Sequence, residues 1–237
     1  HGAGDEQIPL SIAEKCFAPF ANRVALVVKC TSYSPYHKTK DAPVAEVEEA
    51  VRLGATAAAI GCIVCGNFQD QQLEQAGRFV RDAKRFGMPL IAHIYPRGEH
   101  LKPDEYHHWK NVAYAVRCGS ELGVDVIKTL YTGSPETFAK VVEASTVPVV
   151  VAGGVSEDGG IEIFLQQTED ALAAGAKGVA YGRRVWQSSQ PARLVEALRL
   201  VIHEGKPAKE AAGWLESAVS RGAGEVRAVA ETCGPRR

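Results

Sequence analysis

The chain has no large charge excess and no membrane-length apolar run, and nothing in it points to secretion. Its net charge is -1 at pH 7, and no basic stripe with interleaved aromatic residues occurs. We therefore expect neither nucleic acid nor a membrane as a partner. No basic segment followed by an apolar stretch opens the chain, so we expect a cytoplasmic protein.

Cysteine and histidine pairs at the spacing of metal ligands are also scarce. Cys62-Ile-Val-Cys65 has the spacing of a zinc or redox pair, but no second Cys pair and no His pair at ligand spacing follows. Most of the six cysteines lie within or beside apolar runs, as buried free thiols do. We therefore expect no metal site, and free thiols fit a reducing cytoplasm.

The chain does contain regularly spaced apolar runs. It has 237 residues, 46% of them hydrophobic, which is enough for a substantial core in one large domain or two small ones. The runs are continuous rather than alternating, so each predicted strand is buried on both faces, as in a parallel sheet. The six predicted strands cover residues 23–29, 56–61, 89–95, 124–130, 147–152 and 178–182.

Helical patterns separate these strands. Helix starts are marked by Ser134-Pro135-Glu136 and Pro103-Asp104, and Gly87 marks a helix end. The alternation predicts a parallel α/β fold, either an open sheet or a barrel. Glycine-bearing turns after the last two strands favour the barrel, and no GxGxxG follows an early strand, which argues against a nicotinamide-binding fold.

The strand count falls short of a closed barrel, which has eight strands. Residues 1–7 are polar and turn-like, and the chain does not begin with methionine. We therefore expect that the first two βα units are missing from this chain. We assign residues 1–219 to a barrel domain and residues 220–237 to a flexible C-terminal tail.

Lys128 stands near the end of the apolar run 124–130, before a Thr-Gly break. Desolvation disfavours the charged form of a lysine among valine and isoleucine and frees its amine as a nucleophile. That is the chemistry of a Schiff-base lysine. The alternative is a strand-end lysine that reaches solvent or a carboxylate.

Other predicted strand ends also carry residues suited to catalysis or binding. In a barrel, the carboxyl ends of all strands meet at one face, so these residues converge with Lys128. Tyr95 could transfer protons, and backbone N–H groups at glycine turns together with an arginine could hold a phosphate. The phosphate-binding candidates are Gly153, Gly154, Gly182 and Arg183, and we add His93 and Arg97 as candidates for substrate binding.

Each candidate has a structural alternative. Tyr95 could be a ring packed in a turn, and Gly153-Gly154 only a tight connection between a strand and a helix. Arg183 could be paired at the surface. A histidine at the position of His93 is more often a satisfied core residue than a ligand.

At these residues the chain resembles the class I, Schiff-base aldolases of the archaeal and bacterial fructose-bisphosphate aldolase group. That group includes 2-amino-3,7-dideoxy-hept-6-ulosonate synthase and the autoinducer-2 phosphate thiolase. The resemblance spans about residues 12–215. The matching stretches are residues 12–15, 47–55, 95–98, 125–133, 147–154 and 182–187.

The resemblance implies a (β/α)8 barrel without metal or cofactor that acts on a phosphorylated ketose and forms a homo-oligomer. It implies that Lys128 forms the imine and that Tyr95 transfers protons. A synthase or thiolase on another phosphorylated ketose, or an idle barrel remnant that binds sugar phosphate, stays open as an alternative.

Two departures from the family stand out. The family's first strand carries an Asp-His-Gly motif whose aspartate assists catalysis, whereas only eleven residues precede Ile12 and Asp5 stands in no comparable strand. After the seventh strand the family has a basic sequence, and this chain has Gly154-Val-Ser-Glu-Asp158.

Overall fold

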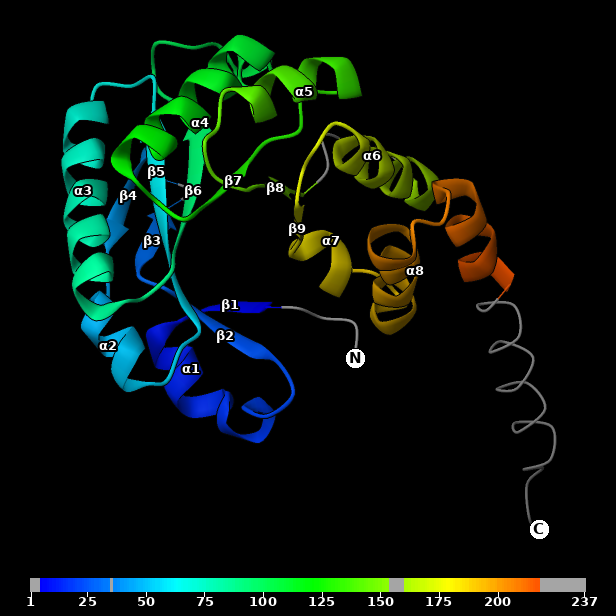
Figure 1. Ribbon diagram of the computed structural model, residues 1–237, viewed down its shortest axis with the longest axis horizontal. Helices are drawn as coiled ribbons and strands as arrows, with labels where there is room; N and C mark the ends of the chain where they lie inside the picture. Colours follow the sequence, from blue (N-terminus) through cyan, green and yellow to red (C-terminus); the bar gives the residue numbers. More distant parts are fainter. Residues whose placement is uncertain (1–4, 35, 154–159, 218–237) are drawn as a thin grey trace.

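A parallel sheet that curls on itself organises the fold, with helices on its outside (Figure 1). The computed structural model describes residues 5–34, 36–153 and 160–217, so Gly154 and the predicted tail 220–237 lie outside the described residues. The sheet has seven strands in the order β1-β2-β5-β6-β7-β8-β9. They are β1 (Asp5–Pro9), β2 (Ala25–Lys29), β5 (Ala57–Val64), β6 (Leu90–Pro96), β7 (Val126–Thr129), β8 (Val149–Ala152) and β9 (Gly178–Ala180).

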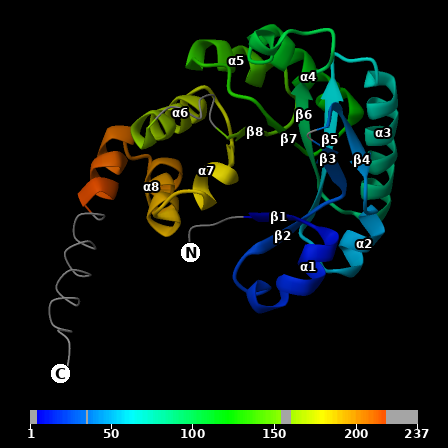
Figure 2. The same cartoon turned by 180° about the vertical axis from the view of Figure 1, so that it is seen from behind.

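All neighbouring strands in this sheet run parallel. Parallel sheets are covered on both faces, which explains why the sequence shows continuous apolar runs. In β5 all eight residues are buried. The helices that cover the outer face appear around the strands when the molecule is seen from behind (Figure 2).

The two faces of the sheet carry different side chains. Leu26 and Ile60 point outward and belong to the main core, together with Phe79 of helix α3 (Gln69–Phe86). The intervening residues point inward, because side chains alternate along a strand. The inner core is small: it consists of Val27, Ala57, Ala59 and Ile91, with Val126 packed against it.

The helix signals at Ser134 and Gly87 are confirmed, whereas Pro103-Asp104 opens only a 3₁₀ turn and the next α-helix begins at Trp109. Ser134 caps the helix that starts at Pro135, its hydroxyl accepting the N–H of Thr137 at 3.3 Å. Gly87 ends α3 with φ +64°, a left-handed conformation that favours glycine. The other helices are α1 (Leu10–Cys16), α2 (Val47–Arg52), α4 (Trp109–Leu122), α5 (Pro135–Glu143), α6 (Ile161–Ala173), α7 (Arg183–Trp186) and α8 (Pro191–Glu204), with 3₁₀ turns at Ala18–Phe20 and Pro103–Glu105 and helical residues at 208–217.

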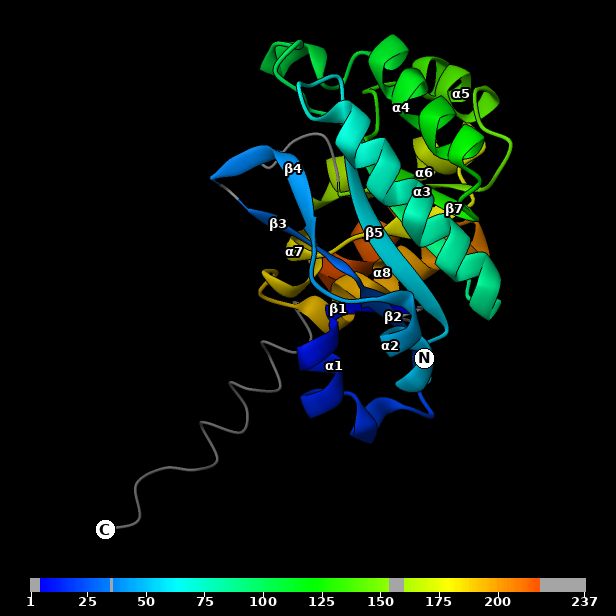
Figure 3. The ribbon, with the colours of Figure 1, turned by 90° about the vertical axis from the view of Figure 1, so that its left-hand side faces the viewer.

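A β-hairpin interrupts the alternation of strands and helices. Strands β3 (Thr31–Ser34) and β4 (His37–Pro43) pair antiparallel and lie beside β5 (Figure 3). The sequence analysis did not predict this hairpin, because its strands are short and polar. Its Asp41 is nevertheless only 5% exposed.

The predicted α/β fold with a curled, barrel-type parallel sheet is confirmed. The count of six strands missed one strand of the parallel sheet and both strands of the hairpin. Residues 1–7 were expected to be turn-like, but Asp5–Pro9 form β1, and Asp5 stands in register with Ala25. Backbone groups pair in a sheet whatever the side chains are, so a polar segment can add an end strand that hydrophobic patterning does not reveal.

Within the described ranges, no helix is both long enough and apolar enough to cross a bilayer.

Two glycine substitutions should have opposite effects on stability. A Cβ at Gly61 would lie 1.7 Å from Oδ2 of Asp41, so Gly61→Ala should lower the free energy of unfolding by about 1–3 kcal/mol through overpacking. Gly213 lies on an exposed helical position with nothing within 4 Å of its added Cβ. Gly213→Ala should therefore raise stability by about 0.5–1 kcal/mol. Urea unfolding followed by circular dichroism measures both, and equal effects would contradict the packing at Gly61.

Candidate active site

Lys128 lies on the inner face of the sheet, in register with His93 on β6 and Val150 on β8. Its side chain is half-buried, and this burial lowers the pKa of the amine from its ordinary 10.5 to about 8. The ammonium of Lys29 on β2 lowers that pKa further, by repulsion. Near neutral pH a larger fraction of Lys128 than of an ordinary lysine is therefore an uncharged nucleophile.

Tyr95 stands two residues after His93 on β6, so both side chains share the face that carries Lys128. Burial raises the pKa of its phenol to about 12, and Asp41 adds to this rise. The guanidinium of Arg97 counteracts it, lying 5.0 Å from the centre of the Tyr95 ring. Tyr95 is therefore a protonated phenol at neutral pH, able to donate a proton.

His93 lies between Tyr95 and the inner core. Its Nε2 atom is buried and has no hydrogen-bond partner in the structure. Burial lowers the pKa of the imidazole well below its ordinary 6.5, and Lys128 and Lys29 lower it further. His93 is therefore a neutral ring, and it differs from the satisfied core histidine that was the structural alternative.

The residues predicted to bind the substrate phosphate follow the two neighbouring strands β8 and β9. Gly153 directly follows β8, and among the described residues nothing lies within 4 Å of an added Cβ there. Gly182 precedes helix α7, and an added Cβ there would come within 2.7 Å of the Trp186 ring, so a side chain at this position would have to displace that exposed ring. Arg183 begins α7 and is exposed. The structure thus brings three of the four phosphate candidates to adjacent strand ends.

The sequence analysis missed a second charged group beside these residues. Lys29 is the last residue of β2 and Lys128 the penultimate residue of β7. Each follows an apolar run, and that shared pattern was the signal for Lys29. Its Nζ donates to Oγ1 of Thr31 at 2.5 Å and lies 3.8 Å from Oδ1 of Asp41. Asp41 and Thr31 come from the hairpin, which had no sequence signal.

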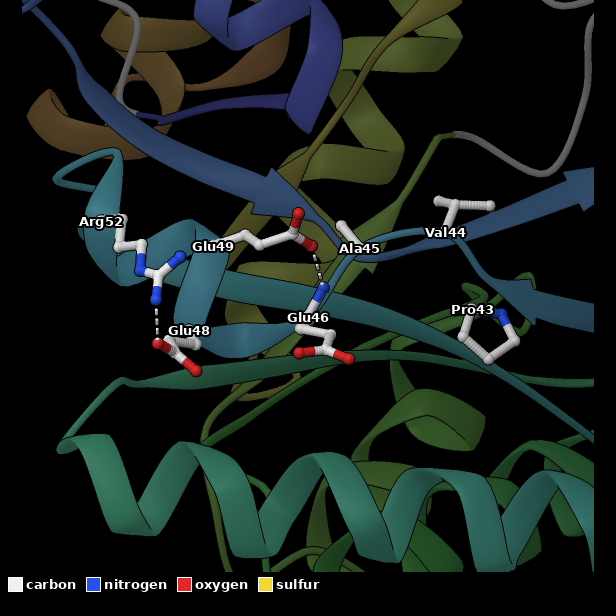
Figure 4. A pocket seen from close by; sticks show the side chains of 7 residues that line it. All are labelled: Pro43, Val44, Ala45, Glu46, Glu48, Glu49 and Arg52. Carbon is white, nitrogen blue, oxygen red and sulfur yellow. Dashed lines mark hydrogen bonds and ion pairs between the residues drawn. The ribbon is translucent and has the colours of Figure 1, made fainter.

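A surface cavity surrounds the N-terminus of α2, apart from these residues (Figure 4). Its carboxylates serve the helix itself: Glu49 accepts the backbone N–H of Glu46, and Glu48 pairs with Arg52. None of the candidate site residues lines it. The lining residues are Pro43, Val44, Ala45, Glu46, Glu48, Glu49 and Arg52.

The Cys62-x-x-Cys65 pair consists of two protonated thiols. Burial raises the pKa of the Cys62 thiol to about 12 and that of Cys65 to about 11, so both are protonated. Among the described residues, no group of three or more His, Cys, Asp or Glu side chains could hold a metal ion.

Fold and site together define a barrel-type α/β protein with a desolvated lysine at a strand end. The model of the DeoC/LacD family aldolases matches residues 12–188. The chain therefore belongs to the DeoC/LacD aldolase family, and its resemblance to the class I fructose-bisphosphate aldolase group is confirmed.

Individual relatives point to two activities. A Halobacterium salinarum 2-amino-3,7-dideoxy-D-threo-hept-6-ulosonate synthase is 40% identical over 158 residues, which cover 67% of this chain and 58% of the synthase. A Thermoproteus tenax class 1 fructose-bisphosphate aldolase is 37% identical over 206 residues, covering 84% of this chain and 74% of that enzyme. The chain thus matches less than two thirds of the synthase's length.

A solved structure extends the comparison to the fold. It is an archaeal fructose-1,6-bisphosphate aldolase whose catalytic lysine is covalently bound to the carbinolamine intermediate of the substrate. It matches with a TM-score of 0.75 and 35% identity over 84% of this chain and 77% of that chain.

The reactivity of Lys128 should follow its lowered pKa. Acetylation by trace acetic anhydride, read by mass spectrometry of the Lys128 peptide, should reach half its maximal rate near pH 8 rather than near 10.5. Lys177, which is exposed, is labelled in the same sample and serves as the internal reference. A midpoint near 10.5 would show that Lys128 is solvated.

Proposed function

We propose that this chain is a Schiff-base aldolase that cleaves or forms a carbon–carbon bond in a phosphorylated ketose such as fructose 1,6-bisphosphate. The observation that carries the proposal is the desolvated amine of Lys128 on the inner face, beside a buried phenol. Family membership supports the same chemistry.

In the proposed reaction, Nζ of Lys128 attacks the ketone carbon and forms a carbinolamine. Its oxygen leaves as water, and a protonated imine remains. This cation then draws the electron pair of the breaking carbon–carbon bond, so that an aldehyde leaves and an enamine stays on the lysine. Protonation of the enamine carbon and hydrolysis release dihydroxyacetone phosphate and the free amine.

Tyr95 would carry the protons in both steps. Its phenol, protonated at neutral pH, donates to the departing carbinolamine oxygen. The phenolate formed in that step accepts the proton of the substrate hydroxyl when the carbon–carbon bond breaks. Arg97 stabilises the phenolate through its position over the ring.

The substrate phosphate would bind at the ends of β8 and β9. Gly153 and Gly182 would offer backbone N–H groups to an anion, together with Gly154, which lies outside the described residues, and the exposed guanidinium of Arg183 would add a charged donor. His93 would face the substrate chain with its unpartnered Nε2. A synthase acting on another phosphorylated ketose uses the same first step, and the 40% identical relative supports that second candidate.

Borohydride trapping tests the central step. Incubation with dihydroxyacetone phosphate and borohydride should add the reduced ketose to Lys128, seen as a mass increase on its peptide. Lys128→Met should abolish the adduct, and Lys177→Met should leave it unchanged. A wild-type protein that gives no adduct with any of a panel of ketose phosphates would refute the proposal.

Substitution of Tyr95 should separate substrate binding from turnover. Tyr95→Phe removes the hydroxyl but keeps the ring, so turnover should fall by about 10²–10⁴-fold while phosphate binding persists. Cleavage of fructose 1,6-bisphosphate, measured through the triose phosphates it releases, checks the rate. Full activity in Tyr95→Phe would assign the proton transfers to another group.

A catalytically idle barrel that binds sugar phosphate is the competing function. It is favoured by one observation: among the described residues, β1 and β9 are the end strands of the sheet and do not pair with each other. Unpaired end strands can pair with another chain, and a homo-oligomer would cover them. Sedimentation measures the oligomeric state.

A separate measurement tests the idle barrel. Binding of a ketose phosphate without an adduct at Lys128 would favour it.

A further inference from the structure

Two buried charged residues take no part in the chemistry described above. Asp41 is 5% exposed, and the side chain of Lys29 is 19% exposed. Burying charges costs free energy unless they are paired and hydrogen-bonded, so their retention calls for a physical reason.

The hairpin delivers the Asp41 carboxylate to the inner face of the sheet. The side-chain position of Gly61 on β5 points inward, and Oδ2 of Asp41 lies 1.7 Å from where a Cβ at Gly61 would be. Gly61 stands in register with His93, and His93 stands in register with Lys128. The carboxylate therefore occupies the same level of the inner face as the candidate nucleophile.

Backbone contacts fix Asp41 at this place. Its N–H donates to Oε1 of Gln72 at 3.2 Å, and its carbonyl accepts from Nε2 of Gln72 at 3.1 Å. Nε2 of Gln75 donates to the same carbonyl at 3.3 Å. Helix α3 thus clamps the backbone of residue 41 and leaves its carboxylate free to face the interior.

The side chain of Lys29, on the neighbouring strand β2, extends to the level of the Asp41 carboxylate. Its Nζ lies 3.8 Å from Oδ1 of Asp41 and donates to Oγ1 of Thr31. That oxygen also accepts the backbone N–H of Gly61 at 2.7 Å, so the ammonium is tied to β5. Oδ1 of Asp41 is buried without a hydrogen bond, and the ion pair is its only contact with a cation among the described residues.

We propose that Lys29 is a positioning residue of the active site: its ammonium, held by Asp41 and Thr31, repels the proton of Lys128 and keeps that amine free to attack. The inference deepens the proposed function, because a free amine is what imine formation requires. Burial lowers the pKa of Lys29 below its ordinary 10.5, and the Asp41 carboxylate opposes this lowering and favours the charged ammonium. The charge of Lys29 in turn adds to the burial that lowers the pKa of Lys128.

Other titratable groups face this pair from the elements around it. On β6 these are His93, which is neutral, and Tyr95, which is protonated. Strand β8 presents no titratable side chain, and the thiol of Cys30 next to Lys29 is protonated because burial raises its pKa to about 11. Helix α4 packs on the outer face, opposite Lys128, with Lys110, Tyr114, Arg117, Cys118 and Glu121.

The test measures how the two amines titrate with pH and needs no substrate. Acetylation of the Lys128 and Lys29 peptides is followed against pH in the wild type, Lys29→Met, Lys29→Arg and Asp41→Asn. The double variant Lys29→Met/Asp41→Asn removes both charges and leaves no unpaired buried ion, so it keeps the test valid if Lys29→Met does not fold. Circular dichroism confirms that each variant is folded.

Loss of the ammonium should raise the labelling midpoint of Lys128 by roughly 0.5–1 pH unit, the size expected of one like charge at this range. Both Lys29→Met and the double variant should show this rise, and Lys29→Arg should keep the wild-type midpoint because it keeps the charge. Asp41→Asn should lower the midpoint of Lys29 itself. An unchanged Lys128 midpoint in both variants that lack the ammonium would overturn the proposal.

Trapping with dihydroxyacetone phosphate then separates the two proposals. At pH 7 the adduct should form about 3–10-fold more slowly in Lys29→Met than in the wild type, and at pH 10 the two rates should converge. A rate deficit that is the same at every pH would mean that Lys29 only supports the fold, and would overturn the positioning role. If the wild type forms no adduct but the labelling shift is present, the aldolase function fails and the positioning role of Lys29 stands.

Discussion

The narrow inner face of the curled sheet is the constraint on which the site depends. Small side chains such as Ala57 and Ala59 fill its lower level and leave little room for water. The next level holds Lys128 and His93, whose charged forms are disfavoured there for lack of solvent. A wider interior would hydrate both groups and remove the reactivity that the proposed chemistry requires.

Elements that follow from apolar periodicity and capping could be predicted from the sequence. This class includes the six inner strands, the helix that Ser134 caps and the helix end at Gly87. So does Lys128, since a lysine that ends an apolar strand is visible in the sequence alone. Lys29 shows the same pattern and could have been found by the same reasoning.

The remaining features depend on contacts between distant segments. Strand β1 is polar and is held by backbone pairing with β2, which leaves no apolar pattern. Asp41 becomes part of the interior only because Gln72, more than thirty residues later, clamps its backbone and because Gly61 leaves space for its carboxylate. The sequence around Asp41 reads as an ordinary polar turn, so its burial could not be foreseen.

The space at Gly61 also has an evolutionary consequence. Any side chain at residue 61 would displace the carboxylate of Asp41, and a displaced carboxylate would leave the ammonium of Lys29 without its counter-ion. Residues 29, 41 and 61 are therefore joined into one inherited unit. Where a descendant of this chain changes one of the three, the other two come under selection to change with it.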